Sequence, residues 1–173
     1  MILNIEIKAR TRNAAGIRSI LQAENADFRG TDHQIDSYFR VPEGRLKLRE
    51  GNIENSLIFY RRPDQEGPKA SEIHLYRPGA ADPALKEVLV AALGIWKVVD
   101  KQREIYFIDN VKFHLDQVAG LGEFVEIEAI DTDGSIGEAQ LRAQCAHYMQ
   151  LFGIPDADLI EHSYSDMPGK KND

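Results

Sequence analysis

The chain has 173 residues, 43% of them hydrophobic and 28% charged, a balance typical of a folded domain rather than a disordered segment. Its formal net charge is −7, which argues against a general nucleic-acid binder with a basic surface. No apolar run reaches the length of about 20 residues that a membrane helix needs, and a single cysteine excludes an intramolecular disulfide. We expect one domain over residues 1–167, a frayed tail over 168–173 and a cytoplasmic protein, because the chain starts on a strand pattern rather than a signal segment.

Eight segments have the composition and alternation of β-strands, which is enough to close a small barrel. They span residues 2–10, 34–40, 44–50, 55–62, 70–77, 96–108, 111–117 and 122–131. Turn-forming residues support this division, because Pro42-Glu43-Gly44 separates two of the segments and Asp109-Asn110 separates two others. Residues 62–69 are expected to form a longer loop.

Three helices are expected between and after the strands. They run from the capping residue Asn13 to about Glu24, over 83–93 between Asp82 and Gly94, and over 136–152 before Gly153. Each has an apolar side suited to covering the outer wall of a barrel. Cys145, on the third helix, is interpreted as a packing residue rather than a nucleophile.

Several strands carry ionisable side chains on one face and aliphatic side chains on the other. Residues 4–8 read Asn-Ile-Glu-Ile-Lys, so Asn4, Glu6 and Lys8 share a face. Later strands repeat the pattern with Arg45, Lys47 and Arg49, with Lys101 and Arg103, with His114 and Asp116, and with Glu126 and Glu128. A flat sheet could expose such rows to water, but a barrel with an ionic interior and helices outside explains them more completely.

A cavity lined by these rows would suit a compact polyanion bound together with a divalent cation. Carboxylates are the ligands that Mg²⁺ or Mn²⁺ prefers, with phosphate and water completing the shell. Guanidinium and ammonium groups would hold the remaining phosphate oxygens. Metal and cations together would stabilise the charge that develops in phosphoryl or nucleotidyl transfer. Transition metals are less favoured, because none of the five histidines forms a ligand pair at metal-site spacing.

The residues resemble the CYTH superfamily, the triphosphate tunnel metalloenzymes, which includes class IV adenylate cyclases, thiamine triphosphatases and inorganic triphosphatases. Glu6 and Lys8, with Asn4 two residues before, look like the family signature Glu-x-Glu-x-Lys. The further matching segments are 36–39, 46–49, 57–63, 101–103, 114–116, 121–128 and Ser163-Tyr164. Their shared order and spacing extend the resemblance over nearly the whole chain.

The resemblance implies an α+β, mainly β fold: a closed eight-stranded antiparallel barrel that binds a linear triphosphate and one or two Mg²⁺ or Mn²⁺ ions. The implied metal ligands are Glu6, Glu126 and Glu128, with Asp116 assisting the metal or water. The implied triphosphate-binding residues are Lys8, Lys47, Arg49, Arg61 and Arg103, to which alternation alone adds Arg45 and Lys101. Catalytic roles are expected for Lys8, Asp116 and Arg103. Asn4 stands where the family has its first acid, and its uncharged amide predicts a weaker metal site.

Two classes of function remain open at this stage. In the first, the protein is an enzyme that either cyclises ATP, as an adenylate cyclase, or hydrolyses a triphosphate such as ATP, tripolyphosphate or thiamine triphosphate. The cationic rows contain no aromatic residue placed to stack on a base, which slightly favours an inorganic or loosely recognised substrate. In the second, the protein is a non-catalytic polyphosphate- or nucleotide-binding module with a degenerate metal site. Neither class involves a nucleic-acid polymer or a membrane as partner.

Overall fold

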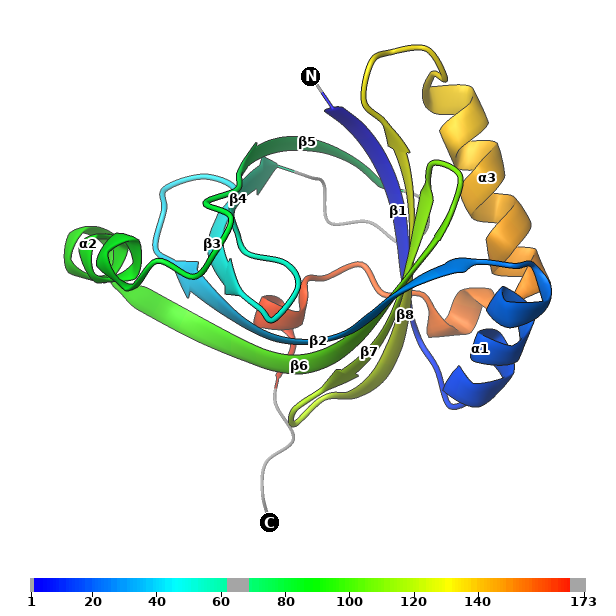
Figure 1. Ribbon diagram of the computed structural model, residues 1–173, viewed down its shortest axis with the longest axis horizontal. Helices are drawn as coiled ribbons and strands as arrows, with labels where there is room; N and C mark the ends of the chain where they lie inside the picture. The colour runs from blue at the N-terminus through cyan, green and yellow to red at the C-terminus, as the bar shows by residue number, and fades with distance from the viewer. Residues whose placement is uncertain (1, 62–68, 169–173) are drawn as a thin grey trace.

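The computed structural model describes residues 2–61 and 69–168, and these form a closed antiparallel barrel with helices outside it (Figure 1). The strands are β1 (Ile2–Arg10), β2 (Asp27–Phe39), β3 (Arg45–Glu50), β4 (Ser56–Arg61), β5 (Lys69–Tyr76), β6 (Ile95–Ile108), β7 (Val111–Val118) and β8 (Gly122–Asp131). Around the barrel their order is β1-β5-β4-β3-β2-β6-β7-β8. The helices are α1 (Ala14–Ala23), α2 (Pro83–Leu93) and α3 (Glu138–Leu151), followed by the short 3-10 turns η1 (Asp156–Asp158) and η2 (Tyr164–Asp166).

The predicted number of strands and the antiparallel barrel are confirmed, but β2 starts seven residues earlier than expected. Residues 27–33 are mostly polar and do not alternate, so their sequence did not indicate a strand. They pair with β6 nevertheless, from Asp27 opposite Phe107 onward, with a shift in register between Phe28 and Gly30. Gly30 has φ of 121°, a conformation that favours glycine, and this irregularity interrupts the sequence pattern.

The larger apolar core lies outside the barrel, between the sheet and the helices α1 and α3, which lie together on one side in Figure 1. It consists of alternate residues of β1, β7 and β8, including Ile5, Ile7, Phe113 and Ile127, packed against Leu21 of α1 and Leu141 of α3. Cys145 belongs to this core, where its thiol donates to Ile5 O at 3.3 Å. Burial raises the pKa of Cys145 to about 11, which agrees with a packing role.

Helix α2 has the predicted ends but not the predicted position. Asp82 caps its first turn and Gly94 follows its last residue. It contains no buried residue, Val88 is 64% exposed, and it lies beside β2 at the opposite end of the molecule from α1 and α3 (Figure 1). Its link to the sheet includes an ion pair of 2.5 Å between Lys86 and Glu50. The expectation that all three helices cover the barrel wall with an apolar side was therefore wrong for α2.

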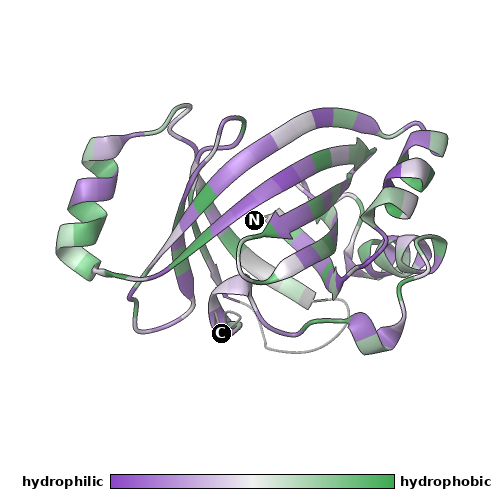
Figure 2. Cartoon of the chain, turned by 90° about the horizontal axis from the view of Figure 1, so that it is seen from below, coloured by the Kyte–Doolittle hydropathy of each residue, from purple (hydrophilic) through white to green (hydrophobic). Residues whose placement is uncertain are grey.

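The inner face of the barrel carries the ionic rows together with apolar side chains such as Ile58, Ile73 and Leu75, and the long strands carry alternating hydrophilic and hydrophobic bands in Figure 2. A second, smaller apolar cluster joins η2 to the sheet and includes Tyr38, Val99, Phe124 and Tyr164. None of the helices in the described part of the chain is long and apolar enough to cross a membrane.

Candidate functional site

The barrel encloses a cavity of about 530 Å³, and most of the charged side chains in its described lining are cationic. Seven lysines and arginines line it against four carboxylates, in a protein whose net charge is −7. The cations are Lys8, Lys47, Arg49, Arg77, Lys101, Arg103 and Lys112, and the carboxylates are Glu6, Glu54, Glu126 and Glu128. The inner surface thus has the opposite sign from the whole chain, so it favours an anionic ligand.

Strands β1 and β8 bring the first ionic row against the last. Lys8 pairs in register with Glu126 and Glu6 with Glu128, so all four side chains project from the same face of the sheet. The ammonium group of Lys8 lies 2.9 Å from Glu126 Oε1 and 3.9 Å from the centre of the Tyr164 ring. Lys8 is therefore held by a carboxylate and an aromatic ring while its charge remains at the cavity surface.

Glu126 is engaged by three nitrogen donors. Besides Lys8, Arg103 Nη2 lies 2.7 Å and His114 Nδ1 2.9 Å from its Oε2. Although burial opposes ionisation, Lys8 and Arg103 hold the pKa of Glu126 well below its usual value. Burial, followed by Arg103, lowers the pKa of His114, and because the ionised Glu126 can only accept, the Nδ1 of His114 is the donor in this contact.

Asp116 lies behind the cavity surface and fixes Arg103. Its two oxygens accept from Arg103 Nε at 2.6 Å and Nη2 at 2.5 Å, and one also accepts from the Tyr164 hydroxyl at 2.8 Å. Arg103 thus bridges Asp116 and Glu126, which orients the guanidinium towards the cavity.

A second cluster of cations is held by one carboxylate, that of Asp36. Its carboxylate is fully buried and accepts from Arg49 at 2.8 and 2.9 Å, Lys101 at 2.9 Å and Lys47 at 3.2 Å. Despite its burial, Arg49 and Lys101 keep the pKa of Asp36 well below its usual value. Burial and the neighbouring Arg103 lower the pKa of Lys101.

Most of the residues predicted for the site line this cavity. They are Asn4, Glu6, Lys8, Lys47, Arg49, Lys101, Arg103, Glu126 and Glu128. Asp116 is not at the surface but contacts two residues that are, Arg103 and Tyr164.

The structure does not bring Arg45 and Arg61 to the cavity. Arg45 lies at the start of β3 and binds Asp166 of η2 at 3.0 Å. Arg61 is half exposed and lies 3.8 Å from Glu43, because Ile58 and Tyr60 are the inward residues of β4. The prediction that Arg61 faces the cavity was therefore wrong, because its side chain lies on the outer face of β4. Position 62 lies outside the described residues.

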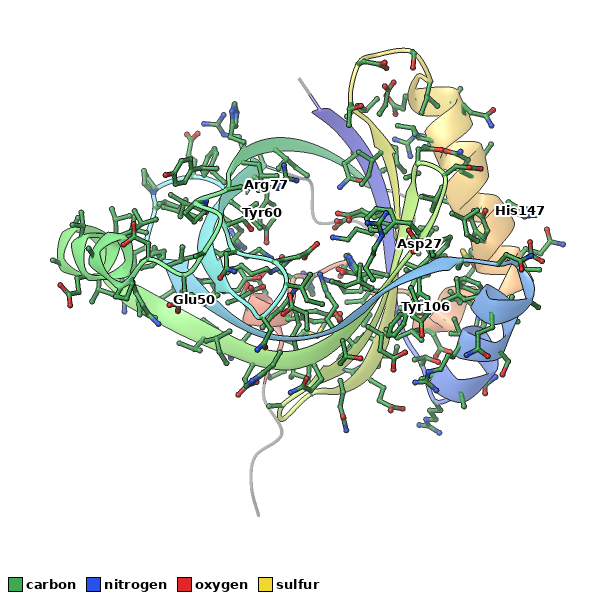
Figure 3. The ribbon with its side chains drawn as sticks, viewed as in Figure 1. Asp27, Glu50, Tyr60, Arg77, Tyr106 and His147 are labelled. Atoms are coloured by element: carbon green, nitrogen blue, oxygen red, sulfur yellow. The ribbon has the colours of Figure 1, made fainter. Side chains whose placement is uncertain are left out.

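Sequence reasoning missed several residues that face or support the cavity. Lys112 shares the alternation of His114 and Asp116 on β7 and could have been found from that spacing, whereas Glu54 lies on a loop without periodicity. Aromatic rings also reach the cavity, from Tyr38, Tyr60, Phe107 and Tyr164. Figure 3 shows Tyr60 together with Arg77 on the side formed by β4 and β5. The prediction that the cationic rows contain no aromatic residue placed to stack on a base did not take these rings into account.

The oxygen donors that fit a divalent cation are fewer than predicted. Within residues 2–61 and 69–168, no three His, Cys, Asp or Glu side chains gather in a metal-binding arrangement. Asp116 and Glu126 are bound by cations, whereas Glu6 and Glu128 lie opposite each other in register on β1 and β8. Asn4 Nδ2 donates to Glu128 Oε1 at 2.7 Å, and its buried Oδ1 has no hydrogen-bond partner in the described structure. Two opposed carboxylates with an orphaned amide oxygen fit a hard cation such as Mg²⁺ or Mn²⁺.

The fold and the cavity define a class of protein: a closed antiparallel β-tunnel with an ionic interior and its apolar core outside. A family profile described as the CYTH domain matches residues 3–164, and the chain belongs to this family. The resemblance seen in the sequence is thereby confirmed.

Individual relatives share the whole length of the domain. The chain is 29% identical over 169 residues to a protein named adenylate cyclase CyaB from Aeromonas hydrophila, covering 92% of this chain and 85% of the relative. A solved structure of a putative adenylate cyclase from Vibrio parahaemolyticus has a TM-score of 0.76 at 20% identity, over 94% of this chain and 95% of that one. A putative adenylyl cyclase from Hippeastrum, described as having a dominant triphosphatase activity, has a TM-score of 0.60 at 17% identity, over 94% and 92%. At these identities the solved structures establish the fold.

Proposed function

We propose that the protein is a metal-dependent enzyme that binds a triphosphate in the tunnel and either hydrolyses it or, with ATP, cyclises it. One observation carries the proposal: five predicted cations from three parts of the sequence line a single cavity beside an opposed pair of carboxylates. These cations are Lys8, Lys47, Arg49, Lys101 and Arg103. Buried and inward carboxylates hold these cations in place, so they are positioned for the phosphates of an anionic ligand.

The cations are positioned to grip phosphates before any reaction begins. Arg49 and Arg103 are each held by a buried carboxylate through two of their nitrogens, which fixes the guanidinium planes. Lys8, held between Glu126 and Tyr164, would neutralise charge on a phosphate oxygen. Catalysis of phosphoryl transfer relies mainly on such positioning and electrostatic stabilisation.

The opposed carboxylates would supply the metal site. Glu6 and Glu128, together with the carbonyl oxygen of Asn4, would hold a divalent cation, which would offset the negative charge of the phosphates. Asp116 would act through Arg103 rather than on the metal, because both its oxygens are already bound by that guanidinium. The resemblance seen in the sequence instead implied that Asp116 assists the metal or water directly.

A non-catalytic binding module is the second candidate, and Asn4 is the observation that favours it. An amide in place of an acid removes one negative charge from the metal site, and the binding of Glu126 by three nitrogen donors removes a further ligand. Such a protein would bind polyphosphate through its cations without turning it over.

The test is incubation of the pure protein with Mg²⁺ or Mn²⁺ and ATP, tripolyphosphate or thiamine triphosphate, followed by identification of the products. Cyclic AMP with pyrophosphate indicates a cyclase, release of phosphate indicates a triphosphatase, and binding without turnover indicates the module. Lys8→Ala should weaken binding by about 2–5 kcal/mol, whereas Lys86→Ala, which removes a lysine paired with Glu50 outside the cavity, should not. Equal affinities of Lys8→Ala and the parent, with both folded, would refute the proposal.

A further inference from the structure

The loop between β3 and β4 carries an acid into the cavity. Residues 51–55 form this loop, and the backbone N–H groups of Ile53 and Glu54 each donate to the carboxylate of Asp32 at 2.9 Å. Asp32 is fully buried in β2 and also accepts from Gln34 Nε2 at 2.8 Å. The loop is therefore anchored to the sheet by the buried carboxylate of Asp32.

Close packing further fixes the loop. A side chain at Gly51 would place its Cβ 2.7 Å from Asp32 Oδ2, and one at Gly30 would place it 2.9 Å from Ile53 Cδ1. Asn55 closes the loop by exchanging hydrogen bonds with Gly51, at 3.2 and 3.0 Å. These contacts fix the backbone of the loop and therefore the position from which the side chain of Glu54 extends.

The carboxylate of Glu54 bridges two cations from different strands. One oxygen contacts Arg49 Nη1 at 3.3 Å and Gln34 Nε2 at 3.2 Å, and the other contacts Lys112 Nζ. Despite burial, Lys112 and Arg49 lower the pKa of Glu54 below its usual value, so it is ionised at neutral pH. Unlike Asp36, which is fully buried behind the cavity, the Glu54 side chain is 27% exposed and lines it.

We propose that Arg49 and Lys112 form a subsite for one end of a polyphosphate, and that Glu54 occupies this subsite as a tethered competitor until the ligand displaces it. The inference rests on the proposed function, because it assigns a further subsite to the same cavity. A tethered carboxylate acts at high effective concentration and excludes an anion that binds nowhere else. When a triphosphate is already held by Lys8 and Lys101, its terminal phosphate also acts at high effective concentration. It can then displace the Glu54 carboxylate from Arg49 and Lys112. Glu54 is thus a specificity-determining residue.

The test is calorimetric titration of tripolyphosphate, in chelator, into the parent, Glu54→Gln, Lys112→Ala and the double variant. Glu54→Gln should lower the dissociation constant by about tenfold, and the double variant should lose that gain. Glu50→Gln is the matched control, because Glu50 pairs with Lys86 and lies towards α2, outside the cavity (Figure 3). If Glu54→Gln is unfolded without ligand, Glu54→Asp should show a smaller gain, since its shorter side chain does not reach Lys112.

The outcomes separate the inference from the proposed function. Unchanged or weaker binding by Glu54→Gln, with the parent still binding, would overturn the inference and leave the function standing. A gain that persists without Lys112, or that Glu50→Gln matches, would overturn it as well, since the effect would then be one of overall charge. Failure of the parent and every variant to bind in chelator, and again in Mg²⁺ or Mn²⁺, would overturn the proposed function itself.

Discussion

Replacing Asp36 by asparagine should destabilise the protein more than any surface change of the same kind. The carboxylate is fully buried and accepts four hydrogen bonds from Arg49, Lys101 and Lys47. An asparagine keeps the shape but removes the negative charge that contacts all three cations, and its amide nitrogen donates where an acceptor is needed. The repulsion among the three cations would then lose this compensation, although Arg49 would keep its contact with Glu54 at 3.3 Å.

Removing one partner of a buried ion pair costs about 3–5 kcal/mol. For a domain of this size, 1 kcal/mol shifts the melting temperature by about 2–4 °C, so Asp36→Asn should melt roughly 6–20 °C below the parent. Tripolyphosphate should recover part of the loss, because a polyanion supplies the missing charge and stabilises the folded state by about 2.7 kcal/mol at 100 times its dissociation constant. Thermal melts with and without tripolyphosphate measure both effects.

Asp27→Asn provides the matched control on the same strand. Asp27 pairs with Arg29 at 2.7 Å, but both side chains are more than half exposed, and such surface pairs contribute about 0–1 kcal/mol. Its melting temperature should therefore stay close to that of the parent. If Asp36→Asn melts no lower than Asp27→Asn, the cations do not depend on Asp36 and the account of the cavity is incorrect.

Three other outcomes are expected. Because the folded-state pKa values of Asp36 and Glu54 lie below their unfolded values, stability should be full above about pH 5 and fall as the pH is lowered further; a melting temperature that stays constant from pH 7 to 3 would contradict this. Asn4→Glu places a charge against Glu128, so it should melt below the parent in chelator and gain more than the parent from Mg²⁺ or Mn²⁺; equal gains would show that position 4 does not contribute to metal binding. Cys145, fully buried with a raised pKa, should react with iodoacetamide only on unfolding, and rapid labelling of the native protein would disprove its burial.

The barrel could be predicted from sequence because strand alternation records which face is buried. The rows containing Lys8, Lys47 and Glu126 face one cavity because inward residues recur every second position in each strand. The same rule fails where the periodicity is broken. The polar start of β2 passes through the irregularity at Gly30, and its pairing depends on β6 rather than on its own composition.

The site could be predicted only as far as the strands carry it. Arg61 was misplaced because the sequence, with two adjacent arginines, does not show which alternate residues of β4 face the cavity. The structure shows that Tyr60 faces inward, so Arg61 faces outward. Glu54 was missed because its position depends on long-range hydrogen bonds to Asp32, twenty-two residues earlier in the chain. The binding of Glu126 by Arg103 could not be foreseen either, because alternation gives the face of a side chain but not its partner.

The one-sided placement of the apolar core has a consequence for how the molecule opens. Strands β1, β7 and β8 are covered by α1 and α3, whereas the described side chains of β3, β4 and β5 are not among the buried members of either apolar cluster, although the partly buried Ala70 of β5 packs against the larger one. Amide hydrogens of β3–β5 should therefore exchange with deuterated solvent by local opening, at a lower free energy than the global unfolding that exposes β1 and β8. A polyanion bound to Lys47 and Arg49 would slow that exchange. The amide exchange rates of β3–β5 would therefore report whether the tunnel is occupied.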